Sequence, residues 1–317
     1  MNESIKAQLV EVNKFLGKVG QETEEPLNSA VKSMLSRQGK MLRPTIFLLT
    51  NELSEKPHDA AVEVAAGIEL LHAASLVHDD IIDKADLRRG KPAIHKEFDS
   101  DTALLVGDYL FAEALRILNE HGGKEAGSKG AVTFRDMVRA QTLELALRHN
   151  PSPSLDLLET VVNGKTVALF VLAGSLGGSK YQETIVSSLS KLGMAFQIAD
   201  DLEDLVGDPK TGVLGEDMAE ATPTIPVHIV MEQIGEEGRS SIRAAYLSDA
   251  DTESKKIATS AIISSGTLKS VNETVQKKIQ EALVNLESLP ATEARNSMEE
   301  LAQKVATKAS EFVKRFE

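Results

Sequence analysis

The sequence predicts an all-α protein that folds as one large helical bundle over residues 1–317. Hydrophobic residues recur at the helical spacing in most segments, for example at Val64, Ile68 and Leu71, whereas sustained alternation of apolar and polar residues is hard to find. A chain of 317 residues is long enough for one large domain or two small ones. Because no Pro-, Gly- or Ser-rich linker separates two halves of distinct composition, we expect a single domain.

The helices are expected in order between clusters of helix-breaking residues. Residues 1–17 show an amphipathic pattern and lack the continuous apolar core of a signal peptide, so we expect a helix there. Breakers gather at 54–59, 121–130, 149–154, 207–226 and 289–295. Long helices are therefore predicted at 60–83, 102–120, 130–149, 182–206, 266–286 and 291–316.

The longest stretch without a charged residue lies between Lys165 and Lys180. It is shorter than the roughly 20 residues that a membrane-spanning helix needs. We therefore expect a buried helix there, and no transmembrane segment in the chain.

The composition excludes several classes of protein. With 42% hydrophobic and 26% charged residues, the chain is expected to be globular and not disordered. Its 35 basic and 48 acidic residues give a net charge of −13, which repels phosphate backbones, so we expect no nucleic-acid partner. The absence of cysteine excludes disulfides, thiolate metal sites and a thiol nucleophile. The cytoplasm is the expected compartment.

Two acidic clusters repeat the pattern Asp-Asp-x-x-Asp at the ends of two different helices. The first contains Asp79, Asp80 and Asp83, and the second contains Asp200, Asp201 and Asp204. On a helix this spacing brings the three carboxylates of each cluster to one side of a single turn. Like charges at these spacings destabilise a helix by about 0.2–0.5 kcal/mol per pair, so a second copy needs an explanation.

A bound divalent cation would explain the repeated clusters. Mg²⁺ prefers one or two carboxylates, together with water and substrate phosphate oxygens, to a cage made entirely by protein. Because apolar residues precede both clusters, the aspartates are expected to end buried helices near the mouth of a cavity. The alternative is that each cluster is a solvated helix end.

Basic residues lie on both sides of the first cluster in the sequence. Arg88, Arg89 and Lys91 follow it, and Lys40 and Arg43 precede its helix. Arginine binds phosphate oxygens in a bidentate manner and lysine adds a point charge, so these residues could form a phosphate site. The alternative for Arg88, Arg89 and Gly90 is a basic turn on the surface.

In their order along the chain, these motifs resemble those of the trans-polyprenyl diphosphate synthase family, of the medium- to long-chain type. The resemblance runs from about Gln38 to Pro226. Its elements are Gly39-Lys40-x-x-Arg43-Pro44, His72, the first aspartate cluster with Arg88-Arg89-Gly90, Gly107-Asp108-Tyr109-Leu110, Lys165-Thr166, and Phe196-Gln197 before the second cluster. Each element alone is weak, but together and in this order they are specific.

The resemblance implies the all-α isoprenoid synthase fold, with both aspartate clusters near the mouth of a central cavity. It implies that the six aspartates hold more than one Mg²⁺, and that Lys165 takes part in catalysis. The allylic diphosphate would be held by Arg88, Lys165, Thr166 and Gln197. Isopentenyl diphosphate would be held in a separate pocket by Lys40, Arg43, His72 and Arg89. The alternatives are that His72 is a core histidine, that Lys165 and Thr166 only begin a helix, and that Gln197 only packs or caps.

The reaction implied is head-to-tail chain elongation by prenyl transfer. Its substrates are isopentenyl diphosphate and an allylic primer, farnesyl or geranylgeranyl diphosphate, and no covalent nucleophile is needed. A homodimer is expected, with a transient membrane contact for product release. The alternatives are a noncatalytic or regulatory subunit of a hetero-oligomeric synthase, and a terpene cyclase of the same fold. Four pocket residues for a second diphosphate and only 4% aromatic residues argue against the cyclase.

The sequence departs from the family pattern in the second half of the site. Thr211-Gly212-Val213 stands where a Gly-Lys pair is usual, with Lys210 displaced, and Thr222 or Pro223 stands at another position that is commonly basic. Leu143-Glu144-Leu145-Ala146-Leu147 stands where Gly-Glu-x-x-Gln is expected. These changes remove positive charge from the predicted allylic site.

Product length is expected to depend on the helix that carries Asp79, because one helical turn of about 5.4 Å is close to one isoprene unit. Ala74 and Ser75 are small, so the growing chain should pass this level. Leu71 would obstruct it partly, and Gly67 and Ile68 would leave room again. We expect a product of C25 to C35, with C20 as the alternative.

Overall fold

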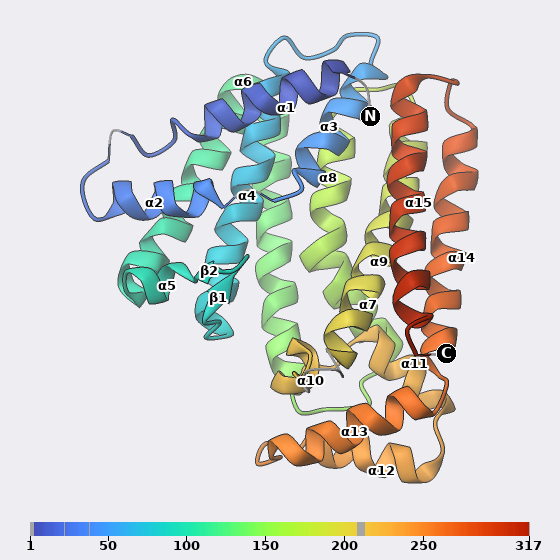
Figure 1. Ribbon diagram of the computed structural model, residues 1–317. Coiled ribbons are helices and arrows are strands. Elements are labelled where there is room, and N and C mark those ends of the chain that lie inside the picture. The colour runs from blue at the N-terminus through green and yellow to red at the C-terminus, as the bar shows by residue number, and fades with distance from the viewer. Residues whose placement is uncertain (1–2, 22, 38, 208–212, 317) are drawn as a thin grey trace. The chain divides into compact units, whose positions relative to one another are not determined.

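The computed structural model describes residues 3–21, 23–37, 39–207 and 213–316, and its elements are almost all helices (Figure 1). The chain divides into two compact units. Unit 1 comprises Met1–Arg135, Leu169–Val186 and Ala291–Met298, and unit 2 comprises Asp136–Ala168, Ser187–Pro290 and Glu299–Glu317. The predicted all-α class is confirmed, and a single domain over 1–317 stays a prediction.

Unit 1 is built around helix α4, Ala61–Ile82, which is apolar on nearly all sides and therefore lies in the core. Helices α1 and α3 both pack against α4. The other elements of this unit are α1 (Glu3–Leu16), α2 (Leu27–Ser36), α3 (Leu42–Glu52), β1 (Leu87–Arg88), β2 (Lys91–Pro92), α5 (Ile94–Glu97), the first part of α6 (Ser100–Leu147) and most of α8 (Ala168–Leu176). The two short strands lie just beyond the end of α4 (Figure 1), so they belong to the surroundings of the first aspartate cluster.

Helix α6 turns back on itself at Gly123, whose backbone angles of φ 83° and ψ 173° are not helical. Glycine adopts this left-handed φ without a steric penalty. The parts before and after Gly123 pack together: Phe111 stacks on Phe134 with ring centroids 4.0 Å apart. The break predicted over 121–130 is therefore wrong in extent, because a single glycine makes the turn and helix continues on both sides.

Unit 2 carries the remaining helices. They are the end of α6, α7 (Leu155–Val162), the π-helical turn η1 (Asn163–Val167), most of α9 (Gln182–Val206), α10 (Glu216–Glu220), α11 (Ile225–Gln233), α12 (Glu236–Ala245), α13 (Thr252–Ser264), α14 (Leu268–Glu287) and most of α15 (Glu293–Val313). Helices α12 and α13 lie side by side (Figure 1). The long helices predicted at 60–83, 182–206, 266–286 and 291–316 correspond to α4, α9, α14 and α15. Helix α10 lies inside the stretch 207–226, which was expected to be irregular.

Two helical stretches, Ala61–Ile82 and Leu155–Leu176, are long and apolar enough to cross a membrane by length and composition. Their apolar windows are 61% and 56% buried within the protein, and core helices of soluble proteins meet the same criteria. This is weak evidence for a membrane span, and the expected absence of one stays a prediction.

Candidate active site

The first aspartate cluster lies at the end of α4 in unit 1. Asp79 and Asp80 belong to its last turn, and Asp83 directly follows its last residue. Asp80 is only 1% exposed. Its Oδ1 accepts a 2.8 Å hydrogen bond from Arg88 Nε and a second bond from Arg88 Nη2, while its Oδ2 is buried without a hydrogen-bond partner among the described residues. Hydrogen bonds therefore join Asp80, which is predicted to bind the metal, to Arg88, which is predicted to bind the diphosphate.

A tight hairpin positions the two arginines that follow this cluster. Strands β1 and β2 are joined by Arg89 and Gly90, whose φ angles are 54° and 76°. Positive φ at both central residues is the pattern of a two-residue hairpin turn, and glycine favours it. The turn directs the Arg89 side chain back to the chain between α2 and α3, where Nη1 donates to the main-chain oxygen of Arg37.

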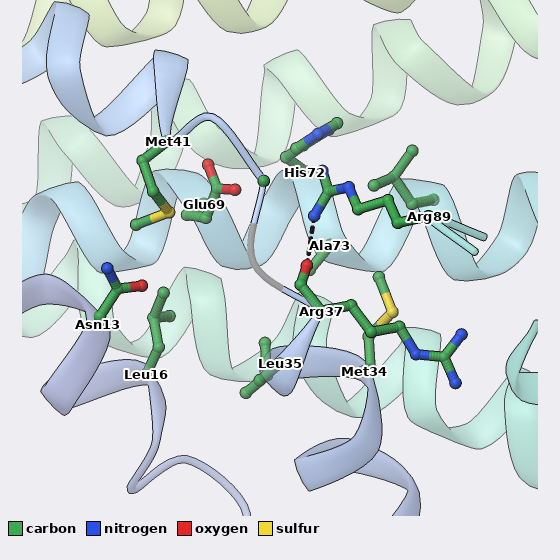
Figure 2. A pocket seen from close by; sticks show the side chains of 12 residues that line it. Asn13, Leu16, Met34, Leu35, Arg37, Met41, Glu69, His72, Ala73 and Arg89 are labelled. Carbon is green, nitrogen blue, oxygen red and sulfur yellow. Dashed lines mark hydrogen bonds between the residues drawn. The ribbon is translucent and has the colours of Figure 1, made fainter. Parts of the chain in front are cut away.

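A pocket in unit 1 is lined by His72 and Glu69 of α4, Gly39, Met41 and Arg89 (Figure 2). Figure 2 shows the guanidinium of Arg89 beside His72, with the dashed bond to the Arg37 main chain, while the side chain of Arg37 points away. An added Cβ at Gly39 would lie 2.4 Å from Arg89 Nη2, so a larger residue would displace this guanidinium. The structure thus brings His72 and Arg89 together, as predicted.

Burial and positive charge set the protonation of this pocket. Burial, together with the charges of Arg43, Arg89 and Arg88, holds the pKa of His72 well below its usual value, so the ring is neutral at pH 7. Burial raises the pKa of Glu69, whereas Arg43 and Arg89 act to lower it. The pKa of Arg43 is lowered to about 10, chiefly by burial, and it remains charged at neutral pH. The pocket is a positively charged environment that suits an anionic ligand.

The other two predicted residues do not line this pocket. The guanidinium of Arg43 lies 5.7 Å from the centroid of the Phe170 ring, and Arg43 acts on His72 through its charge. Lys40 is exposed. Of the four residues predicted to hold isopentenyl diphosphate, only His72 and Arg89 therefore line this pocket.

The predicted allylic residues Lys165 and Thr166 lie in the π-helical turn η1 of unit 2. Such turns often mark functional sites, because they change the direction of the side chains within a helix. Lys165 Nζ donates to Glu144 Oε2. Thr166 Oγ1 donates to Gln197 Oε1 at 2.5 Å, and Gln197 Nε2 donates to Asp201 Oδ1 at 2.6 Å. Thr166, Gln197 and Asp201, which span 35 positions of the sequence, thus form one hydrogen-bonded chain.

A second pocket, in unit 2, is lined by this group. Glu144, Lys165, Thr166, Gln197 and Asp201 form its polar part. Its apolar part is formed by Leu158, Val161, Val162, Pro223 and Ile225, and Thr224 also lines it. A lining that combines polar groups with aliphatic side chains would suit an anionic head with a hydrocarbon chain.

The second aspartate cluster lies in the last two turns of α9. Burial and the nearby carboxylates raise the pKa of Asp201 to about 8 and that of Asp204 to about 7. The pKa of Asp217, near the start of α10, is also raised well above its usual value. The causes are burial and the nearby Asp201, Asp204 and Glu144. Like charges are therefore crowded into a buried region that a cation would stabilise.

Gly215 allows the start of α10 to approach the second aspartate cluster. An added Cβ at Gly215 would lie 1.7 Å from the main-chain oxygen of Asp204, so no larger residue fits without moving the backbone. The close approach holds the start of α10, and with it Asp217, against the end of α9.

Among the described residues, no group of three or more His, Asp or Glu side chains is arranged to hold a metal ion. Mg²⁺ does not need such a group, because water and substrate oxygens supply most of its ligands. The unpartnered, buried oxygens of Asp80 and Asp217 and the crowded carboxylates near Asp201 are groups that a divalent cation would satisfy. The residues present therefore fit such a metal.

The residues predicted to limit product length lie in the core of unit 1. Leu71 and Ala74 are fully buried, and Ser75 is partly exposed. The room expected at Gly67 is filled, because an added Cβ there would lie 3.0 Å from Leu118 of α6. Gly130, beyond the turn of α6, lies close to both Leu118 and Leu71.

Four site residues were not identified from the sequence. Glu69 stands alone in an apolar stretch, three residues before His72, which was an available signal. Glu144 lies in the segment that departs from the family pattern, and Asp217 follows Gly215 in a Gly-x-Asp pattern that was also an available signal. Lys308 of α15, which pairs with Asp200 and Glu203, carries no local signal, because it reaches the second cluster only through folding. Gln38, Lys210, Thr211 and Gly212, where the resemblance begins or the pattern is broken, lie outside the described residues.

Comparison with known proteins then identifies the family. Residues 24–263 match the family model described as "Polyprenyl synthetase". The chain belongs to this family. It is 30% identical over 283 residues to an all-trans-nonaprenyl-diphosphate synthase (geranyl-diphosphate specific) of Rhodobacter capsulatus, with 87% of each chain covered. It is also 30% identical to heptaprenyl diphosphate synthase component 2 of Geobacillus stearothermophilus, with 93% of each chain covered.

A solved structure has the same polyprenyl synthetase fold. The polyprenyl synthase from Caulobacter crescentus CB15, complexed with calcium and isoprenyl diphosphate, superposes with a TM-score of 0.87 at 26% identity, covering 96% of this chain and 95% of that chain. The predicted isoprenoid synthase fold is therefore confirmed. So is the predicted class of enzyme, a trans-polyprenyl diphosphate synthase, which is a prenyltransferase.

Proposed function

We propose that this polyprenyl synthetase elongates an allylic diphosphate with isopentenyl diphosphate, in a reaction that requires Mg²⁺. The observation that carries the proposal is the hydrogen-bonded chain of Thr166, Gln197 and Asp201, which lines one pocket together with Lys165. A cation, a hydroxyl and an amide therefore lie beside Asp201, a carboxylate that we propose to bind the metal. This combination suits a diphosphate that must be held while it leaves the substrate.

In the proposed reaction, the bond between C1 of the allylic primer and its diphosphate breaks, and the diphosphate leaves with the electron pair. The double bond of isopentenyl diphosphate attacks C1, and a proton is then lost, with the departing diphosphate as its acceptor. Mg²⁺ held by the six predicted aspartates would act as a Lewis acid that neutralises the leaving group. Lys165 and Arg88 would add positive charge, and Thr166 and Gln197 would orient the diphosphate.

We assign the isopentenyl diphosphate to the pocket of His72 and Arg89. The neutral His72 ring can donate one hydrogen bond to a phosphate oxygen without a counter-charge, and Arg89 supplies a charged donor. Arg43 contributes through its charge, and we propose that the exposed side chain of Lys40 also binds this diphosphate. The calcium and isoprenyl diphosphate in the Caulobacter protein support a divalent metal and a diphosphate substrate.

The proposed product is C25 to C35, with C20 as the alternative, made from farnesyl or geranylgeranyl diphosphate. The small side chain of Ala74 next to the half-buried Ser75 supports passage of a growing chain. The heptaprenyl product in the name of the Geobacillus relative lies at the upper end of this range, and the nonaprenyl product of the Rhodobacter relative lies beyond it. Leu118 against Gly67 adds a barrier that favours the shorter end.

The protein is proposed to act in the cytoplasm as a homodimer, with a transient membrane contact for product release. Leu104 and Leu105 of α6 are 51% and 59% exposed, which supports an interface on this helix. Because one relative is named as component 2 of a synthase, a regulatory partner remains the second candidate. Sedimentation of the purified chain distinguishes a homodimer from a monomer that needs a partner.

The deciding experiment is turnover by the purified chain alone with farnesyl diphosphate, isopentenyl diphosphate and Mg²⁺, followed by sizing of the products. Elongated products that disappear when EDTA is added would support the proposal. A cyclic hydrocarbon formed without isopentenyl diphosphate would identify a terpene cyclase instead. No turnover until a second subunit is added would identify a noncatalytic or dependent subunit.

A further inference from the structure

Lys308 of α15 contacts the second aspartate cluster from far along the chain. Its Nζ lies 3.3 Å from Asp200 Oδ1 and 3.0 Å from Glu203 Oε2. Both acids lie on α9, and the lysine lies 108 residues after Asp200. The three side chains are 33–45% exposed, so the contacts are neither fully buried nor fully solvated.

The position of this lysine is significant because its acceptor is a predicted metal ligand. Asp200 Oδ1 cannot give the same lone pairs to an ammonium group and to a divalent cation. A positive charge a few Å away also opposes the approach of a second one. Lys308 therefore competes with a metal for Asp200.

Glu203 is a second acidic partner for Lys308. Glu203 is not part of the Asp-Asp-x-x-Asp pattern, yet its contact with Lys308 is the shorter of the two. If a metal takes Asp200, the flexible lysine side chain can keep its pair with Glu203 and lose only one partner. The exchange therefore needs a side-chain movement and no change of fold.

We propose that Lys308 is a positioning residue that holds Asp200 in the metal-free protein and is displaced from it by the divalent cation. It offsets the repulsion within the cluster when no metal is bound, and it raises the metal concentration that the site needs. This inference rests on the proposed function, because it takes Asp200 as a metal ligand.

The test is direct titration with Mn²⁺, followed by electron paramagnetic resonance, with and without inorganic pyrophosphate. Lys308→Met removes the charge and keeps much of the side-chain volume. We expect it to bind Mn²⁺ about fivefold more tightly than the wild type, since a nearby like charge is removed. Lys308→Arg, which keeps the charge, should stay close to the wild type. The matched control is Lys304→Met, which removes an exposed lysine one turn earlier on α15 and should change the affinity less than about twofold.

Each outcome has a separate meaning. If the wild type binds no Mn²⁺ under either condition, the metal assignment of the proposed function fails and the inference fails with it. If the wild type binds Mn²⁺ and Lys308→Met binds it equally or less tightly, the inference alone is wrong. Weaker binding only with pyrophosphate would show that Lys308 contacts the diphosphate instead. Should Lys308→Met not fold, as judged by circular dichroism, Lys308→Gln provides the same loss of charge with a polar side chain.

Discussion

Arg88 donates two hydrogen bonds to the same carboxylate oxygen of Asp80, and the other oxygen of Asp80 remains buried without a partner among the described residues. The two oxygens of this carboxylate therefore differ in their surroundings. One oxygen is held in place by the Arg88 guanidinium, and the second is an oxygen that a bound cation would satisfy.

Asp80→Asn and Asp200→Asn should each lower kcat by about 100- to 1,000-fold, because an amide cannot neutralise a divalent cation that stabilises the leaving group. Steady-state turnover at saturating Mg²⁺ measures the effect. Asp86→Asn is the control, since Asp86 is an exposed acid that pairs with Lys96 at 2.9 Å. Full activity of the folded Asp80→Asn or Asp200→Asn protein would contradict the metal assignment.

Arg89→Ala should mainly raise the KM for isopentenyl diphosphate, and Lys165→Ala should mainly raise the KM for the allylic primer. A lost charge-assisted contact costs about 1.5–3 kcal/mol, which corresponds to about a 10- to 100-fold change in affinity. Arg116→Ala, at an exposed arginine paired with Glu113, controls for the loss of a charge. Equal effects of both site variants on both substrates would refute the division into two pockets.

In excess EDTA, the protein should lose stability as the pH rises from about 4 to 8. Asp201 and Asp204 have folded-state pKa values of about 8 and about 7, whereas an unfolded aspartate titrates near 3.9. Between these values the folded state holds protons that the unfolded state releases, so the free energy of unfolding decreases with rising pH.

Melting temperatures at about pH 6 and pH 8.5 measure this loss. Asp201→Asn removes one of the two groups, so its decrease should be smaller than that of the wild type. Added Mg²⁺ should restore stability at the higher pH, since it binds the ionised carboxylates. An identical pH response of the wild type and Asp201→Asn would show that Asp201 does not carry this linkage.

Product length should respond to substitutions on the two helices that meet near Leu71, which are α4 and α6. Ala74→Phe should shorten the product, because it puts a bulky ring where the growing chain is predicted to pass. Leu71→Ala should lengthen it, and so should Leu118→Ala, because Leu118 fills the space at Gly67. The two leucine truncations should also lower the free energy of unfolding by about 2–5 kcal/mol.

Reverse-phase sizing of the products from one primer checks this prediction, with melting curves to show that each variant is folded. Val10→Ala, at a valine of α1 that is 52% exposed, is the control that should leave both product length and stability unchanged. An unchanged product distribution in all three core variants would mean that α4 and α6 do not limit the chain.

Long periodic segments and ordered motifs were sufficient to predict much of the molecule. The stretch from Val64 to Leu71 predicted a core helix, because its apolar spacing matches one helical repeat. His72 with Arg89, and Lys165 with Gln197, were assigned to two diphosphate pockets from motif order. The structure places each of these pairs in a pocket of its own, while the binding roles stay predictions until tested.

The remaining features depend on contacts between residues that are far apart in the chain. A run of glycines at 122–130 indicated a break, but which one turns α6 depends on how Phe111 and Phe134 pack. Lys308 has the same local sequence signal as any exposed lysine of an amphipathic helix, and becomes part of the site only because α15 lies beside α9. Local sequence sets helical period and motif chemistry, because these depend on neighbouring residues. Side-chain partners, burial and the pKa of Asp201 depend on the packed neighbours that surround a residue in three dimensions.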